Sequence, residues 1–143
     1  MDVRGQISAE YLLVIVVVLI ILSYSITNFI GPTIDASNDV SWTSDSKNAV
    51  STIANAVNLV YANGPKSQRT VTFHIPKNGM QFTSNSNYLI LNTLLNNATT
   101  KPVNASINYP VTINSPTLNT AWYKANVTWS PGSSSISINV TAV

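Results

Sequence analysis

The sequence contains no cysteine and very few charged side chains. Without cysteine there can be no disulfide framework, thiol nucleophile or cysteine metal site. Charged residues make up 8% of the 143 residues, whereas soluble globular proteins carry about 25%. Polar uncharged residues take their place, because 18 Ser, 15 Thr and 18 Asn form over a third of the chain. Such a surface is hydrated without being charged, as we expect of an extracellular protein.

Residues for acid–base chemistry are scarce as well. His74 is the single histidine, and its strand-like surroundings predict a solvent-facing side chain. From Pro65 to Val143 there is no carboxylate, so this segment cannot supply a Ser-His-Asp arrangement, a carboxylate pair or a hard-cation site. We therefore expect no enzymatic activity, no cofactor and no metal ion. The basic residues of the same segment are scattered and mostly not interleaved with aromatic residues, so no nucleic acid is expected as a partner.

The few charges are unevenly distributed along the chain. All five acidic residues lie in the first 45 positions, and Pro65 to Val143 holds five basic residues: Lys66, Arg69, Lys77, Lys101 and Lys124. These cations can pair with Asp35, Asp39 and Asp45, in the same chain or in a neighbouring copy, and such pairing would favour one register. The alternative is that the charges are solvated and that each pair contributes less than about 1 kcal/mol.

A long apolar segment lies near the N-terminus. From Tyr11 to Leu22 every residue is apolar, and the 24 residues from Ile7 to Ile30 include one charge, Glu10. A helix of this length reaches about 36 Å, which exceeds the hydrocarbon core of about 30 Å. A lone strand in lipid would leave backbone groups unsatisfied, so a helix is predicted. Arg4 precedes the segment and places the N-terminus in the cytoplasm.

This apolar segment also has two simpler interpretations. A cleaved secretory signal fits poorly, because no suitable small-x-small site follows the run and the basic region before it is only four or five residues long. An ordinary single-pass membrane anchor has the same hydropathy, so the apolar run alone cannot exclude it. The residues that precede the run are what distinguish these interpretations from the one that follows.

Those preceding residues read Arg4-Gly5-Gln6-Ile7-Ser8-Ala9-Glu10-Tyr11. This stretch resembles the class III leader of archaeal type IV pilins, with a Gln-x-Ser-x-Glu-Tyr motif, found in methanogens and related archaea. The resemblance covers the leader and the apolar run, about 25 residues. It implies that a membrane prepilin peptidase cuts between Gly5 and Gln6. The assembly residues that it implies are Gln6, Ser8, Glu10 and Tyr11.

The resemblance implies a structural subunit of an adhesive pilus. The partners would be identical subunits in a homopolymer, the prepilin peptidase and the pilus assembly machinery. The precursor would lie in the cell membrane, and the mature chain in an extracellular filament. Glu10 would pair with the free α-amino group of Gln6 on the adjacent subunit, since an unpaired carboxylate in an apolar segment is costly; alternatively, Glu10 flanks the membrane as an ordinary interfacial residue. Archaellins share the general architecture, but their leader differs from this one.

Two other functions stay open at this point. The chain could be a single-pass, glycosylated surface or adhesin-like protein that stays in the membrane, or a minor pilin. An anchored protein would keep Met1, whereas a pilin would begin at Gln6.

The rest of the chain divides by its periodicity into helix and strands. We expect a leader over residues 1–5, a hydrophobic assembly helix over 6–30, an amphipathic continuation over 31–64 and a β-rich head over 65–143. Gly31-Pro32 predicts a break or kink. A stripe at helical spacing then follows, and Asn63-Gly64-Pro65 ends it. The residues of the stripe are Ala49, Val50, Ile53, Ala54, Val57, Val60 and Tyr61.

After Pro65 the period changes to two, which predicts strands. Strands are expected over 70–75, 80–83, 88–92, 105–109, 111–113, 122–129 and 134–140. Lys77-Asn78-Gly79 predicts a hairpin turn between the first two, and Pro110 predicts an edge strand or a break. The last two strands, joined by Ser130-Pro131-Gly132, form the clearest pair. The fold class is therefore α+β, with a long N-terminal helix and an antiparallel sheet or sandwich as the head.

Four sequons for N-glycosylation lie in the predicted head, at Asn97, Asn104, Asn126 and Asn139. Some matches are expected by chance in a chain so rich in Asn, Ser and Thr. Asn97 and Asn104 are the best candidates, because they lie in or just after the polar loop over residues 96–101.

Overall fold

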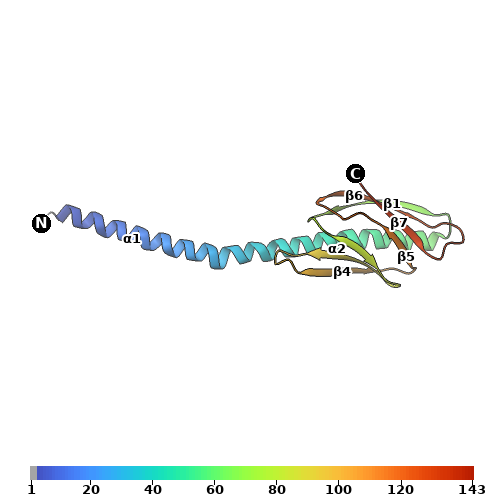
Figure 1. The fold of residues 1–143 in the computed structure, drawn as a ribbon, viewed down its shortest axis with the longest axis horizontal. Coiled ribbons are helices and arrows are strands. Elements are labelled where there is room, and N and C mark those ends of the chain that lie inside the picture. Colours follow the sequence, from blue (N-terminus) through green and yellow to red (C-terminus); the bar gives the residue numbers. More distant parts are fainter. Residues whose placement is uncertain (1–2) are drawn as a thin grey trace. The chain divides into compact units, whose positions relative to one another are not determined.

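The fold is α+β, as predicted. The computed structural model describes the backbone of residues 3–143 and the side chains from Ala9 onward. Within this range a helical segment is followed by seven strands that form two sheets (Figure 1). Met1 and Asp2 of the predicted leader lie outside the described residues. The chain divides into two compact units, residues up to Asn38 and residues from Asp39 to Val143. The second half of the predicted helix therefore belongs to the same unit as the strands.

The helical segment contains a π-helical turn in front of the Gly-Pro pair. It consists of α1 (Val3–Ser25), the π-helix η1 (Ile26–Ile30) and α2 (Gly31–Asn63). The backbone N–H of Gly31 donates to the carbonyl of Ile26, five residues earlier. Pro32 has no N–H to donate, and in a regular α-helix its ring would clash with the carbonyl of Asn28. A widened turn relieves this crowding, so the predicted break takes the form of a π-helical turn and helix continues through Pro32.

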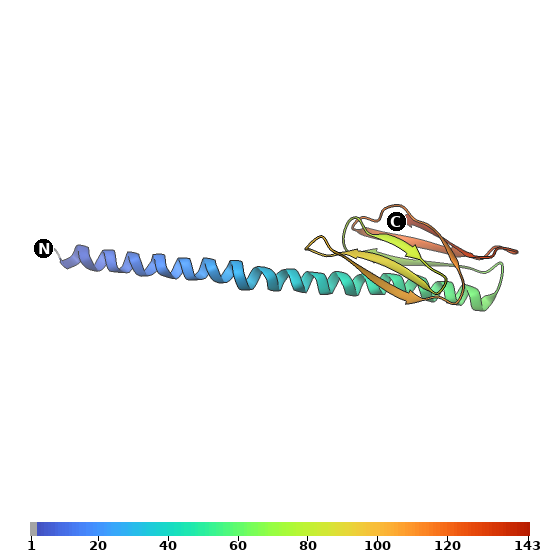
Figure 2. The same cartoon turned by 60° about the horizontal axis from the view of Figure 1, so that its bottom comes forward.

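The strands of the second unit form a four-stranded and a three-stranded sheet. The first sheet has the order β1 (Gln68–Ile75), β6 (Ala121–Thr128), β7 (Ile136–Ala142) and β5 (Val111–Asn114). The second has the order β2 (Gln81–Ser84), β3 (Tyr88–Leu94) and β4 (Thr100–Ser106). All pairings are antiparallel except that of β5 with β7, which is parallel. Both sheets lie along the part of α2 that belongs to this unit (Figure 2).

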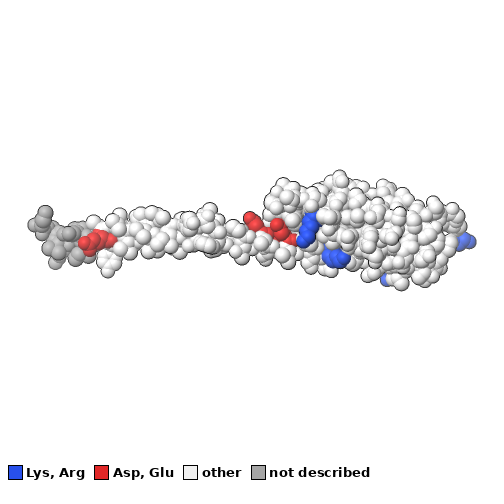
Figure 3. Space-filling model, turned by 90° about the horizontal axis from the view of Figure 1, so that it is seen from below, with Lys and Arg blue, Asp and Glu red and all other residues white. Residues whose placement is uncertain are grey.

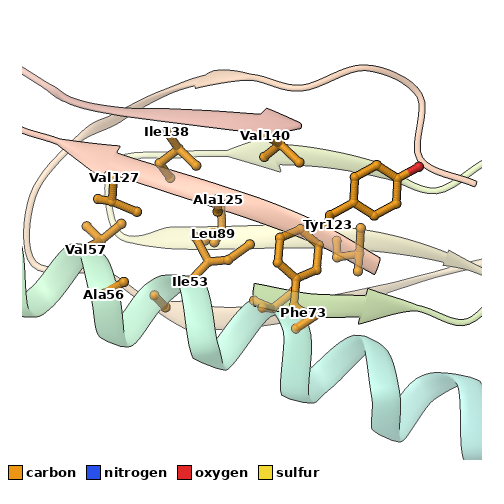
Figure 4. Packing of buried hydrophobic residues seen from close by; sticks show 14 of the residues in the cluster. Ile53, Ala56, Val57, Phe73, Leu89, Tyr123, Ala125, Val127, Ile138 and Val140 are labelled. Carbon is orange, nitrogen blue, oxygen red and sulfur yellow. The ribbon is translucent and has the colours of Figure 1, made fainter. Parts of the chain in front are cut away.

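The predicted helical stripe forms one side of the core. Val50, Ile53, Val57 and Val60 are at most 1% exposed. Ile53, Ala56 and Val57 point from the helix toward apolar side chains of the sheets (Figure 4). Tyr61 departs from the prediction, since it is 40% exposed at the end of the stripe. Its ring stacks on the rings of Tyr109 and Trp129 at centroid distances of 5.3 and 5.8 Å.

The helix stop is confirmed. The helix ends at Asn63, and Gly64 has a φ of +83°, the left-handed conformation typical of a residue that ends a helix. The hydroxyl of Ser67 donates to the carbonyl of Val60 at 2.8 Å, so one carbonyl of the last turn finds a side-chain partner.

The strand predictions are partly confirmed. The β6–β7 pair forms across the predicted turn, where Gly132 has a φ of +78°. The predicted hairpin at Lys77-Asn78-Gly79 is wrong, because β1 pairs with β6 and β2 pairs with β3. The turn instead carries the chain from one sheet to the other. Met80, which is fully buried, forms an isolated bridge with Leu118 in the core at this crossing.

One further strand lies elsewhere than predicted, and one strand departs from the predicted antiparallel arrangement. The strand expected over 105–109 lies earlier, because β4 pairs with β3 over its full length and begins inside the expected polar loop. The structure also places β5 at an edge of its sheet, directly after Pro110, as predicted. The parallel direction of β5 was not predicted, because strand periodicity carries no information on pairing direction.

Candidate functional site

The apolar residues of the first unit are exposed. Each residue from Tyr11 to Leu22 keeps 45–70% of its surface accessible. A contiguous apolar surface of this size marks a membrane or protein contact. The helix that contains it is, by length and composition, the one helix of the described chain long and apolar enough to cross a membrane. We conclude that this surface needs either lipid or other protein chains to cover it.

Polar side chains near the C-terminal end of this unit bond to the helix itself. The hydroxyl of Thr27 donates to the carbonyl of Ser23 at 2.9 Å, and that of Thr33 to the carbonyl of Phe29 at 2.6 Å. The side-chain amide of Asn28 donates to the carbonyl of Tyr24 at 2.9 Å. Such bonds to carbonyls one turn earlier let polar residues enter an apolar environment at lower cost. The region around the π-helical turn is therefore compatible with burial.

The residues of the predicted leader and assembly motif lie in α1. Gly5, Gln6 and Ser8 have helical backbone, and the side chains of Gln6 and Ser8 lie outside the described part of the chain. Glu10 is exposed and Tyr11 is 70% exposed. Gln6 and Glu10 are one helical turn apart, so both positions lie on the same side of the helix.

The four predicted glycosylation sites have different surroundings. Asn97 lies in the turn between β3 and β4, next to Ala98, whose φ is +60°. The amide and the hydroxyl of Thr99 both donate to Asn97 Oδ1, at 3.0 and 2.5 Å. In this Asx turn the two functional groups of the sequon face each other.

The other three sequon asparagines lie in strands. Asn104 in β4 and Asn139 in β7 are exposed, and Asn126 in β6 is half-buried. Asn126 Oδ1 accepts a long hydrogen bond of 3.4 Å from Thr70. Asn97 is exposed as well and is the one of the four that lies in a turn rather than in a strand.

A groove that the sequence did not predict runs between α2 and the β3–β4 hairpin. It has a volume of about 580 Å³ and is lined chiefly by Asp39, Val40, Lys47, Leu95, Lys101 and Asn104. Asp39 accepts a hydrogen bond from the backbone N–H of Asn96 at 2.8 Å. Lys47 Nζ donates to the carbonyl of Asn104 at 2.5 Å. The helical spacing of 39, 43 and 47 could have indicated a shared face, but nothing in the sequence indicated the hairpin opposite.

This groove bears on the expected charge pairing. Asp39 lines it together with Lys47 and Lys101, so one of the three predicted acidic partners lies in the same groove as lysines of its own chain. Figure 3 shows how sparse charged atoms are on one face of the molecule. Pairing between copies stays a prediction.

A second pocket contains a carboxylate beside the single histidine. Asp45 on α2, His74 on β1 and Trp122 on β6 line a pocket of about 270 Å³. His74 lies on the outer face of its strand, as predicted, but it is half-buried, with its ring 5.3 Å from that of Trp122. The sequence offered no carboxylate after Pro65, and the fold supplies Asp45 from the helix instead.

Comparison with known proteins provides no relative. No protein-family model, curated protein or solved structure matches this chain. Among the residues that the structure describes, no three histidine or carboxylate side chains gather as a metal site would require. The features of this chain that bear on its function are therefore the motif, the exposed apolar helix and the head.

Proposed function

We propose that this chain is a structural subunit of an archaeal type IV-like adhesive pilus. The observation that carries the proposal is the Gln6-x-Ser8-x-Glu10-Tyr11 motif in the first turns of a helix whose residues 11–22 are all apolar and exposed. The motif supplies a processing site at Gly5-Gln6, and the helix supplies a surface that requires partners. The precursor would lie in the cell membrane and the mature chain in an extracellular filament.

The polymer would form by moving the apolar helix from lipid to the helices of other copies. This transfer gains little from the hydrophobic effect, because lipid tails are as apolar as leucine. Close packing and polar pairs must therefore decide whether helices prefer each other. Cleavage creates an α-amino group at Gln6, and Glu10 of the adjacent subunit is a carboxylate that this cation can neutralise. The head, which is rich in Ser, Thr and Asn, would form the hydrated outer surface.

A second candidate function uses the same helix as a permanent anchor. The helix is long and apolar enough to cross a membrane, so a single-pass glycosylated surface or adhesin-like protein is consistent with it. A minor pilin is a variant of the main proposal. The anchor and the pilin differ in whether the leader is removed.

The decisive experiment is mass spectrometry of the N-terminal peptide from sheared cell-surface filaments. We expect a chain that begins at Gln6. A chain in filaments that still begins at Met1 or Asp2 would overturn the proposal, and so would an intact chain found only in membranes.

A matched pair of glycine variants tests the cleavage site. Gly5→Leu should leave an unprocessed, membrane-bound precursor, because glycine lets a protease approach the backbone closely. Gly31→Ala is the control, since an added Cβ there meets nothing closer than the Ile26 carbonyl oxygen at 3.8 Å. It should be processed normally.

A further inference from the structure

The pocket that contains Asp45 and His74 has the features of a ligand site. Trp122 is 60% exposed, although buried tryptophan would contribute far more to stability than exposed tryptophan does. The register places it directly opposite His74 across the β1–β6 pair, with 54° between the two ring planes. A flat, accessible aromatic face therefore forms one wall of the pocket.

The opposite wall is polar and comes from one side of α2. Asp45, Asn48 and Thr52 follow one another at spacings of three and four residues, so they lie on one helix face. Thr72 lines the pocket from β1. This wall offers a carboxylate, an amide and two hydroxyl groups, which together can accept and donate hydrogen bonds. Ala49 and Phe73 line the pocket as well and are at most 3% exposed, so its floor is apolar.

The charge of the pocket limits the ligands that fit. Asp45 is the single Asp, Glu, Lys or Arg among the lining residues that the structure describes. A phosphate, a sulfate or a uronic acid would be repelled by the carboxylate, and no Lys or Arg among these lining residues offers it a permanent positive charge. A purely apolar ligand would cover the carboxylate without giving it a partner, which is costly. A ligand with many hydroxyl groups and one apolar face satisfies both walls.

We propose that this pocket binds a neutral saccharide. The C–H face of a sugar ring would stack on Trp122, and neighbouring hydroxyl groups would donate to Asp45, with Asn48 and Thr52 completing the hydrogen bonds. The volume of about 270 Å³ fits a single ring rather than a long oligosaccharide. This site gives the proposed pilus a ligand class for adhesion, and in that sense it rests on the proposed function.

The test uses the full chain, produced without glycans and kept in a polyoxyethylene detergent, which contains no sugar. Saturation-transfer NMR is recorded with the methyl glycosides of glucose, galactose and mannose, and with N-acetylglucosamine. We expect at least one of them to bind. Trp122→Ala and Asp45→Asn should each weaken binding at least tenfold, and Trp122→Phe should weaken it less. Asp39→Asn, which removes a carboxylate from the other groove, is the matched control and should bind as the wild type does.

Glucuronic acid and tetramethylammonium complete the set of probes. Glucuronic acid is included because its negative charge should be repelled by the Asp45 carboxylate. Tetramethylammonium is included because a carboxylate beside an indole also suits a cation. The proposal is wrong if no neutral sugar binds, if both Trp122→Ala and Asp45→Asn bind like the wild type, or if tetramethylammonium binds more tightly than every sugar. Near-ultraviolet circular dichroism shows whether each variant is folded. The assay requires no filament, so a failure to bind sugar and a failure to polymerise are separate results.

Discussion

Lys77 Nζ lies 4.1 Å from the centroid of the Trp42 ring and donates a hydrogen bond to the carbonyl of Leu95 at 3.0 Å. One lysine thus connects three distant parts of the second unit: α2, the turn after β1 and the chain after β3. The ammonium group gains a hydrogen bond and a cation–π contact at the same time. In a unit with so few charges, this contact is one of the few in which a cation stabilises the fold.

Replacing the ring tests this contact. Trp42→Leu keeps an apolar side chain but removes the π face, and it should reduce the free energy of unfolding by about 1 kcal/mol. Lys77→Met should have a similar effect, because it also removes the hydrogen bond to Leu95. Chemical denaturation of the full chain in detergent measures both. If the effects of the two substitutions simply add in the double variant, the two side chains do not interact.

The second prediction concerns Thr93, a polar residue in the core. Its side chain is fully buried in β3, and its hydroxyl has no hydrogen-bond partner among the described residues. A buried hydroxyl without a partner costs about 1–3 kcal/mol. Thr93→Val replaces the hydroxyl by a methyl group of nearly equal size, so we expect the unfolding free energy to rise by about 1 kcal/mol. Thr83→Val on the exposed side of β2 is the control and should change little; a destabilised Thr93→Val would mean that the hydroxyl has a partner.

The Asx turn at Asn97 predicts the order of glycan attachment. We expect Asn97 to be occupied first, ahead of the strand residues Asn126 and Asn139, because its sequon lies in an exposed turn with Thr99 bonded to the asparagine oxygen. Thr99→Ser should keep the site occupied, and Thr99→Val should empty it. Glycopeptide mapping of the native protein measures the occupancy directly. Full occupancy at Asn126 with an empty Asn97 would contradict this order.

The sequence predicted the features that depend on local periodicity. The stripe around Ile53 is amphipathic, and Gly64 ends it, so the helix and its buried face could be identified from spacing alone. Alternation over Ile136 to Val140 likewise identified the last strand and its pairing with β6. Such patterns work because one face of each element is buried and the other is not.

Pairing between distant segments could not be predicted in the same way. The turn at Gly79 has the residues of a hairpin, but the burial of Met80 carries the chain into the other sheet. The pocket at His74 was missed for a related reason. Its carboxylate, Asp45, lies 29 positions earlier, and the packing of α2 along β1 is what joins them.

The last prediction concerns Glu10, the one charge in the apolar segment, and it follows from the proposed function. In a filament of packed helices its carboxylate would be buried, which is tolerable only beside an opposite charge. Glu10→Gln keeps the shape of the side chain but removes that charge, and leaves the α-amino group of Gln6 on the neighbour without its partner. Breaking a buried pair in this way costs about 3–5 kcal/mol, so the variant should be cleaved normally yet form few filaments. Immunoblotting for the processed chain and electron microscopy of sheared filaments separate these two steps. Asp2→Asn is the control, because its side chain leaves with the leader and should affect neither step. Abundant filaments from Glu10→Gln would reduce Glu10 to a residue that flanks the membrane, and a failure of cleavage would assign it to recognition by the peptidase.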